Sequence, residues 1–204
     1  LKLQVNPHMF LNSLNIIYSL ARLNKTEQLC DFSVVLMEYF RYLLRSNSAY
    51  ATIKDEMGFI SSYLRIQQVR FPDRISFGFA VDEKAEQILI PRLLIENFVE
   101  NAAKYSIKNG RITEIFVGVE IKNNCLYITV ADNGNGIHHD ILRQINADEI
   151  VEDETGKHIG IWNCRRRLNY YYQGDYKLDI SSKIGEGTRI ELILPIEPKV
   201  PDEE

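Results

Sequence analysis

Polar side chains with a helical spacing occur in the stretch PRLLIENFVENAAKYS, residues 91–106. If this stretch is helical, Asn97, Asn101 and Lys104 share one side of it, because residues three and four apart are neighbours on a helix surface. An amide oxygen, a magnesium ion and a lysine ammonium can together hold a triphosphate. A solvated helix face with ordinary polar pairs is the simpler alternative, and this stretch taken alone favours it.

The segment DNGNGI, residues 132–137, follows a strand-like run and offers a second polar group. The carboxylate of Asp132 can accept a hydrogen bond from an exocyclic amine such as that of adenine. Gly134 and Gly136 allow the backbone to approach a ligand that a Cβ atom would block. A plain strand-ending turn is the alternative, because Asp, Asn and Gly are common turn residues.

Two further segments place glycine next to predicted regular structure. HIGIWN, residues 158–163, ends in a helix start, where backbone amides favour phosphate. GEGT, residues 185–188, taken alone is typical of a hairpin turn. An Asn-Asn-Lys helix, a strand with DxGxG, a long loop, a glycine entering a helix and GxGT before a last strand are hard to obtain together by chance. The succession predicts a nucleotide site.

A candidate nucleophile lies near the amino end, in QVNPHMFLNSLNII, residues 4–17. Proline inside a helix costs roughly 3 kcal/mol or more, so Pro7 marks either an unusual backbone or a helix start. The imidazole of His8 is largely neutral at pH 7 and then has one nucleophilic nitrogen. Asn12, four residues on, is spaced to hydrogen-bond the other nitrogen and fix the tautomer. A plain surface histidine is the alternative, and this stretch alone does not decide between them.

Hydrophobic periodicity outlines the elements that must position these groups. Apolar residues at three- and four-residue steps predict helices over residues 3–23, 27–45, 53–70, 91–106 and 159–172. Pro91 would stand in the first turn of its helix, where proline is tolerated. Strands are predicted over residues 75–81, 112–122 and 125–132, and a hairpin over 176–195. Residues 134–156 are predicted to form a long irregular loop.

The first two predicted helices are joined by a short break and should form an antiparallel hairpin. The apolar stripe of the first is broad and consists of Phe10, Leu11, Leu14, Ile17, Tyr18 and Ala21. A hairpin alone would leave part of this stripe exposed, so we expect a second copy to complete a four-helix bundle in a homodimer. The turn FPDR at 71–74 is the expected boundary between this helical part and an α/β sandwich, which makes the fold class α+β.

Composition excludes several classes of function. The 204 residues carry a net charge of −4, which argues against a nucleic-acid-binding surface. Three cysteines, Cys30, Cys125 and Cys164, lie far apart, which fits a reducing compartment and offers no zinc site. No apolar run approaches the ~20 residues of a membrane span. Because the chain starts with leucine, we expect it to be a fragment of a longer protein.

The order of these segments resembles the ATP-binding domain shared by histidine kinases, gyrase, the Hsp90 chaperones and MutL, called the Bergerat fold. QVNPHMFLN resembles the phosphoacceptor box of the LytS/YesM-like sensor histidine kinases, written roughly QxNPHFLFN. RYLL, YLRIQQVRF, ENAAKYS and NCRRRL also resemble that group. The resemblance covers residues 3–195.

The resemblance implies a role for each matching residue. His8 would accept the γ-phosphoryl group of ATP, with Asn12 and Glu100 as further candidate catalytic residues. Asn101 would coordinate Mg²⁺ and Asp132 would bind adenine. Residues 138–158 would form a mobile lid over ATP. The other cofactor-binding candidates are Asn97, Lys104, Gly134, Gly136, Ile137, Gly160, Ile161 and Thr188, of which Thr188 would support the Asp132 side of the pocket.

Asn97 separates this group from the ATP-hydrolysing relatives, in which a glutamate usually stands four residues before the magnesium asparagine. A neutral amide cannot act as a general base, so phosphoryl transfer to a side chain is favoured over hydrolysis. Glu96 and Glu100 point about 100° away from Asn97 and Asn101 on the helix. The base that takes the proton from His8 stays open. His158 stands where glycine is common, which keeps open a nucleotide-binding scaffold that signals without kinase activity.

The resemblance implies a sensor histidine kinase core of two domains, 1–72 for dimerisation and phosphoacceptance and 73–198 for ATP binding, with a tail over 199–204. Transfer of the phosphoryl group to an aspartate of a partner response regulator would follow autophosphorylation. Relatives carry sensor and membrane segments upstream. We therefore expect this chain to be the cytoplasmic part of a plasma-membrane protein.

Overall fold

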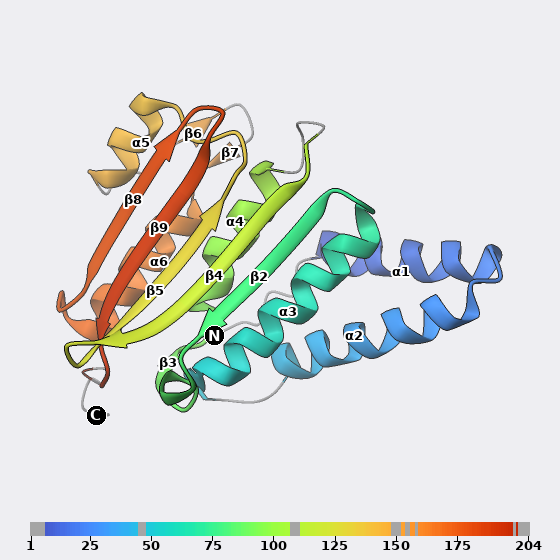
Figure 1. The fold of residues 1–204 in the computed structure, drawn as a ribbon, viewed down its shortest axis with the longest axis horizontal. Helices are drawn as coiled ribbons and strands as arrows, with labels where there is room; N and C mark the ends of the chain where they lie inside the picture. Colours follow the sequence, from blue (N-terminus) through green and yellow to red (C-terminus); the bar gives the residue numbers. More distant parts are fainter. Residues whose placement is uncertain are drawn as a thin grey trace.

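The computed structural model describes residues 7–44, 48–106, 111–147, 152–153, 156–157, 159–197 and 199 (Figure 1). The helices are α1 (Pro7–Arg22), α2 (Thr26–Leu44), α3 (Ile53–Arg70), η1 (Glu83–Ala85, a 3₁₀ turn), α4 (Leu94–Ser106), α5 (His139–Asn146) and α6 (Ile159–Tyr172). The strands are β1 (Tyr50–Thr52), β2 (Ile75–Val81), β3 (Leu89–Pro91), β4 (Thr113–Lys122), β5 (Cys125–Asp132), β6 (Glu152–Asp153), β7 (Gly156–Lys157), β8 (Lys177–Lys183) and β9 (Gly187–Pro195).

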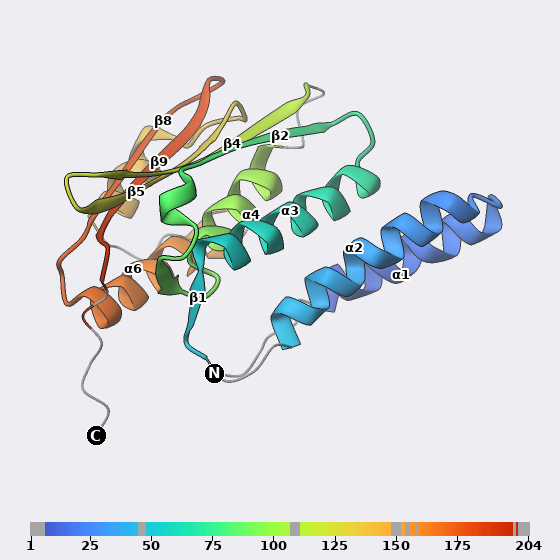
Figure 2. The same cartoon turned by 60° about the horizontal axis from the view of Figure 1, so that its bottom comes forward.

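A five-stranded sheet in the order β2-β4-β5-β9-β8 forms one layer of the molecule. β2 runs parallel to β4 and the other pairs are antiparallel. Alternate residues of the central strands, such as Val117 and Ile128, are buried because successive side chains of a strand point to opposite faces. α3, α4 and α6 cover that face (Figure 2). The predicted α+β class is confirmed.

α1 and α2 form the predicted hairpin, which extends away from the sheet beyond α3 (Figure 2). Asn24 turns the chain between them with a left-handed backbone, φ +54°. Met9, Ser13 and Leu20 of α1 are buried within the chain, whereas Leu14 stays 45% exposed. The hairpin therefore leaves apolar surface uncovered, as the breadth of the stripe predicted. The exposed apolar side chains of α1 are Phe10, Leu11, Leu14 and Tyr18.

α3 lies between the hairpin and the rest of the chain. Phe59 of α3 stacks with two tyrosines of α2, at ring-centroid distances of 4.9 Å to Tyr39 and 4.4 Å to Tyr42. Immediately before α3, β1 pairs with β3, so that Tyr50 lies opposite Pro91. α3 is thus attached to both parts of the molecule, and the division near residue 72 stays a prediction.

The predicted helix over 91–106 is wrong at its start, because α4 begins only at Leu94. Pro91 belongs to β3, and Leu93 adopts a left-handed backbone with φ +58°. The reason is a pair of long-range contacts. β1 fixes Pro91 in an extended conformation, and the carboxylate of Glu56 accepts a hydrogen bond from the Leu93 amide at 2.6 Å.

The predicted irregular loop over 134–156 is also wrong in part, because α5 forms within it. Ile141 and Leu142 of this short helix are half-buried and Ile145 is buried, so one face packs on the core while the polar face meets solvent. The eight residues of α5 span only about two helical turns, which is too short for a clear hydrophobic periodicity in the sequence. The helix is therefore stabilised by packing and not by its own propensity.

The other elements agree with the sequence. α3, β2 and α6 have the predicted extents, and Asn123 and Asn124 turn the β4–β5 hairpin with φ values of +49° and +59°. Positive φ at both central residues is the geometry that asparagine tolerates in a two-residue hairpin loop.

Gly187→Ala tests the close packing of β9 on the end of β5. Gly187 has φ +107°, and a Cβ atom there would lie 1.9 Å from the carbonyl oxygen of Asp132. We expect the substitution to lower the free energy of unfolding by more than about 1 kcal/mol in urea titrations. Gly58→Ala is the control, because a Cβ atom there would meet nothing within 4 Å apart from its chain neighbours and the backbone of α3 itself. Alanine there should raise stability by roughly 0.5–1 kcal/mol. Equal effects of both changes would contradict the packing.

Candidate functional site

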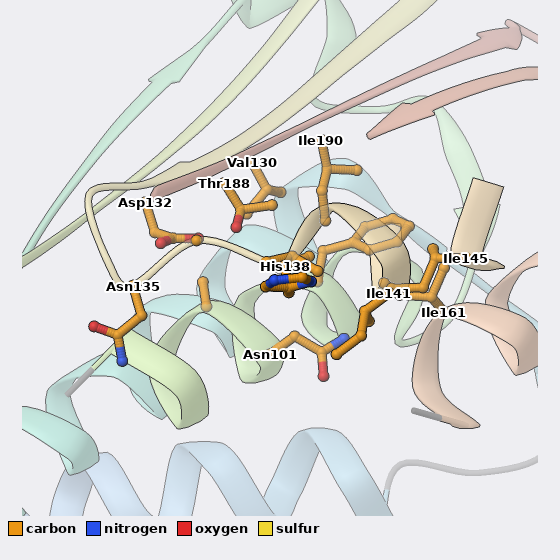
Figure 3. Close-up of a pocket in the computed structure, with 14 residues that line it drawn as sticks. Asn101, Val130, Asp132, Asn135, His138, Ile141, Ile145, Ile161, Thr188 and Ile190 are labelled. Carbon is orange, nitrogen blue, oxygen red and sulfur yellow. The ribbon is translucent and has the colours of Figure 1, made fainter. Parts of the chain in front are cut away.

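A cavity of about 200 Å³ lies between α4, α5 and the start of α6 on one side and the end of β5 and the start of β9 on the other (Figure 3). Its apolar wall consists of Phe98, Ala102, Val130, Ile137, Ile141, Ile145, Ile161 and Ile190. Its polar groups come from Asn101, Asp132, Asn135, His138 and Thr188, with Gly136 at the edge. A mostly apolar pocket with a few convergent polar groups is the usual form of a small-molecule site.

Asp132, the last residue of β5, is fixed at one wall of this cavity. It lies directly opposite Thr188 in the β5–β9 register. Its carboxylate accepts a hydrogen bond from the Gly134 amide at 2.8 Å, which folds the following turn against the side chain. Gly134 therefore positions Asp132 and is not itself among the lining residues.

Two glycine segments that are separate in sequence brace each other here. Gly136 has φ +69°, and a Cβ atom on it would lie 2.1 Å from the carbonyl oxygen of Lys183 at the end of β8. The amide of Gly185 in the β8–β9 turn donates to the carbonyl of Asn135 at 2.8 Å. Gly136 therefore allows a close backbone contact with Lys183, and this contact shapes the cavity wall.

Ser182 is a site-forming residue that sequence reasoning missed. Its hydroxyl accepts a hydrogen bond from the Ile137 amide and donates to the carbonyl of Gly187, both at 2.8 Å. It also lies 3.0 Å from the hydroxyl of Thr188. This one oxygen links the loop after Asp132 to the start of β9. Nothing in the pair Ser181-Ser182 distinguishes it in sequence, because its role depends on a register known only from the fold.

α4 presents Asn101 to the cavity, opposite the Asp132 wall (Figure 3). Gly160, in the first turn of α6, packs beside it, and a Cβ there would lie 3.3 Å from the Asn101 side-chain nitrogen. Asn97 and Lys104 are not among the lining residues. The amide of Asn97 donates to the backbone carbonyl of Leu93, and Lys104 is exposed.

α4 also packs on α3 and carries two acids away from Asn101. Glu96 and Glu100 raise the pKa values of Tyr39 on α2 and Tyr63 on α3, in each case after the larger effect of burial. Burial also raises the pKa of Glu96 to about 8, with added repulsion from Glu100 and Glu56 and partial relief from Arg167. Glu100 is not among the residues that line the cavity, and its charge acts on tyrosines of the helical layer.

The turn that carries His8 is held against α3, although the His8 side chain itself lies outside the described residues. Its neighbour Met9 is only 5% exposed, and the side-chain amide of Gln67 lies 3.8 Å from the Met9 sulfur. Asn12 is half-buried one turn further along α1. The chain thus fixes the backbone of this turn next to the carboxyl end of α3.

The predicted lid region is described in part. His138 precedes α5, lines the cavity and keeps its side chain 61% exposed, while the His139 side chain is 85% exposed. Both histidines are therefore largely exposed, and sequence reasoning did not place His138 at the cavity. His158 lies outside the described residues. Among the described residues, no group of three His, Cys, Asp or Glu side chains could hold a metal ion.

Two family models match the chain. Residues 86–198 match the family described as histidine kinase-, DNA gyrase B-, and HSP90-like ATPase, and residues 1–75 match the histidine kinase model. Sensor histidine kinase YesM of Bacillus subtilis is 31% identical over 201 residues, which are 98% of this chain and 33% of YesM. Sensor protein LytS of Staphylococcus epidermidis is 33% identical over 199 residues, 96% of this chain and 33% of LytS. The chain spans about a third of the length of these curated relatives.

Solved structures support the fold. The histidine kinase domain of a blue-light activated histidine kinase from Erythrobacter litoralis matches with a TM-score of 0.51 and 15% identity, covering 93% of both chains. The catalytic domain of histidine kinase ThkA matches with a TM-score of 0.57 and 14% identity, covering 74% of this chain and 97% of that one. Among the described helices, none combines the length and apolar character that a membrane span requires.

Glu96→Gln tests the half-buried acid on α4 through the pH dependence of stability. The pKa of Glu96 is about 8 in the folded chain and near 4.5 for an ordinary glutamate. Between those values the folded state holds a proton that the unfolded state releases, so the free energy of unfolding falls as pH rises. Thermal melts should therefore show Glu96→Gln stabilising the chain more at pH 8.5 than at pH 5. A difference from the wild type that does not change with pH would contradict this.

Proposed function

Because the chain belongs to the family of histidine kinase-, DNA gyrase B- and HSP90-like ATPases, and its amino-terminal part matches the histidine kinase model, we propose that it is the catalytic core of a sensor histidine kinase. It would bind Mg²⁺ and ATP, phosphorylate itself on His8 and pass the phosphoryl group to an aspartate of a response regulator. The observation that carries this proposal is that Asp132 and Asn101 line opposite walls of one cavity.

Asp132 and Thr188 would bind the adenine end of ATP. The carboxylate of Asp132 would accept from the exocyclic amine, and the apolar wall of the cavity would hold the ring by burial. Bracing by Gly134 and Ser182 supports this role, because a carboxylate whose position is fixed before binding discriminates better between donors and acceptors. Gly136, Ile137 and Ile161 would shape the same wall.

Asn101 would face the phosphates and supply a ligand to Mg²⁺. A single amide oxygen fits this ion, which usually takes few protein ligands and completes its shell with water and substrate phosphates. Bound Mg²⁺ would neutralise charge on the β- and γ-phosphates. Gly160 packs so close to Asn101 that a Cβ atom on it would lie 3.3 Å from the side-chain nitrogen. The helix start of α6 would therefore reach the same phosphates, and Lys104 would contact them from the exposed end of α4.

In the transfer step, an imidazole nitrogen of His8 would attack the γ-phosphorus in line. A nitrogen–phosphorus bond would form, the bond from the γ-phosphorus to the β–γ bridging oxygen would break, and ADP would leave with the electron pair. The imidazolium would then lose its remaining N–H proton. Asn12 would hold the second imidazole nitrogen. Glu100, which lies on the helix-facing side of α4, is our candidate for taking that proton.

Asn97 supports transfer over hydrolysis. Its side-chain amide donates to the carbonyl of Leu93, the residue just before α4, so Asn97 has a structural role. A neutral amide is also not a general base for water. We therefore place this chain with the kinases of its family and not with the gyrase- or HSP90-like hydrolases.

Pairing of two copies through the hairpin would complete the kinase. The exposed side chains Phe10, Leu14 and Tyr18 of α1 and Val34 and Met37 of α2 form the surface that a second hairpin would cover. Sedimentation equilibrium tests this pairing, and a chain that stays monomeric at micromolar concentration contradicts it. In the whole protein, sensor and membrane segments would precede this core and place it in the cytoplasm.

Incubation with γ-labelled ATP and Mg²⁺ tests the proposed kinase with the wild type, His8→Gln and Asn101→Ala. We expect acid-labile, base-stable label on the wild type and none on His8→Gln. Asn101→Ala should lose label by at least about 100-fold, because it removes the metal ligand. Lys54→Ala, an exposed change in α3, is the control and should label normally.

Two other outcomes would contradict parts of this proposal. Label that persists in His8→Gln means that another residue is the acceptor. Tight nucleotide binding without any label would instead support a signalling scaffold.

A further inference from the structure

A group of four interacting residues, which we call the hinge clamp, lies where the hairpin joins the ATP-binding part. It consists of Tyr42 of α2, Glu56 of α3, Arg92 between β3 and α4, and Arg167 of α6. None of the four lines the cavity. Residues 45–47, which connect α2 to β1, lie outside the described residues. Tyr42 precedes this connection in the sequence, and the other three clamp residues follow it.

Glu56 is the centre of the clamp. Its side chain is fully buried, and one carboxylate oxygen accepts from both the Tyr42 hydroxyl and the Leu93 amide. Burial raises the pKa of Glu56, while the hydrogen bonds from Tyr42 and Leu93 lower it. A buried carboxylate is costly unless such donors hold it. The same oxygen therefore joins the end of α2 to the start of α4.

Arg92 holds both sides of the connection between α2 and β1. Its guanidinium donates to the backbone carbonyl of Tyr42 and lies over the Tyr42 ring, 4.6 Å from the centroid. Its backbone amide donates to the carbonyl of Ala49 at 3.0 Å. One residue thus fixes the last turn of α2 and the residue just before β1.

Arg167 extends the clamp to α6. Its guanidinium donates to the backbone carbonyl of Arg92. α6 carries Gly160 and Ile161 at the cavity, and α4 carries Asn101 there. Both helices that contribute to the proposed phosphate side of the site are therefore attached to the end of α2 through side-chain contacts.

We propose that the hinge clamp positions the hairpin for phosphoryl transfer, so that Tyr42 and Arg92 act as positioning residues that set how fast His8 is phosphorylated but not how tightly nucleotide binds. This inference rests on the proposed kinase function. Tyr42 is held at three points in the described state, because its ring stacks on Phe59, its hydroxyl donates to Glu56 and its carbonyl accepts from Arg92. Loss of a hydrogen bond would let the end of α2, and with it the His8 turn, shift relative to α4.

Tyr42→Phe and Arg92→Lys test the clamp in the 204-residue chain with two readouts. Phenylalanine keeps the stack on Phe59, and lysine keeps the charge, so both variants should fold, which thermal melts verify. We expect kcat for His8 labelling to fall about 10-fold, since small misplacements of reacting groups have effects of this order or larger. The Kd for ATP should change by less than twofold. Hydrogen exchange in the last turn of α2 should become faster in both variants.

Tyr39→Phe is the matched control, because Tyr39 is also on α2 and also stacks on Phe59 but does not belong to the clamp. It should leave kcat and hydrogen exchange unchanged. Clamp variants with unchanged kcat, with raised kcat, or with Kd weakened as much as kcat would overturn the proposal. If the wild type takes no label, the kinase proposal fails, and unchanged hydrogen exchange in the clamp variants would separately overturn the clamp.

Discussion

The close approach of β9 to the end of β5 is the contact on which the site depends. Gly187 brings its backbone so near the carbonyl of Asp132 that a Cβ atom would overlap it, and this places Thr188 directly opposite Asp132. The Ser182 hydroxyl then ties the next loop to the same strand. A carboxylate at the end of a strand, followed by a glycine turn, would otherwise have several positions. Pairing of β5 with β9 leaves one position for the Asp132 carboxylate, at the wall of the apolar cavity.

α4 connects the two parts of the molecule because its two sides have different partners. One side presents Asn101 to the cavity, while Glu96 and Glu100 raise the pKa values of tyrosines on α2 and α3. Its first turn is held by Glu56. A movement of the helical hairpin would therefore act on the same helix that we propose to bind the nucleotide. This arrangement suits a protein in which a phosphoacceptor on one part must meet a nucleotide on another.

Local patterns were sufficient to predict much of the fold and part of the site. Asp132 and Gly136 could be predicted because the residues that form a turn are adjacent in the sequence. Asn101 could be predicted because the spacing of residues on one helix face is also a local pattern. Ser182, Glu56 and the true start of α4 were not found. Each depends on a partner far away in sequence: Ile137, Leu93 and β1, respectively. α5 was missed because two helical turns are stabilised by packing on the core, which no short stretch reveals.

Mapping the phosphoryl group after incubation with Mg²⁺ and ATP tests the central claim most directly. Tandem mass spectrometry at neutral pH, where phosphohistidine survives, would assign the modified residue among peptides of the whole chain. We expect a phosphoryl group on the peptide of α1 that contains His8. A phosphoryl group on a different residue, or an unmodified chain that nevertheless holds ATP in the cavity of Asp132 and Asn101, would contradict it.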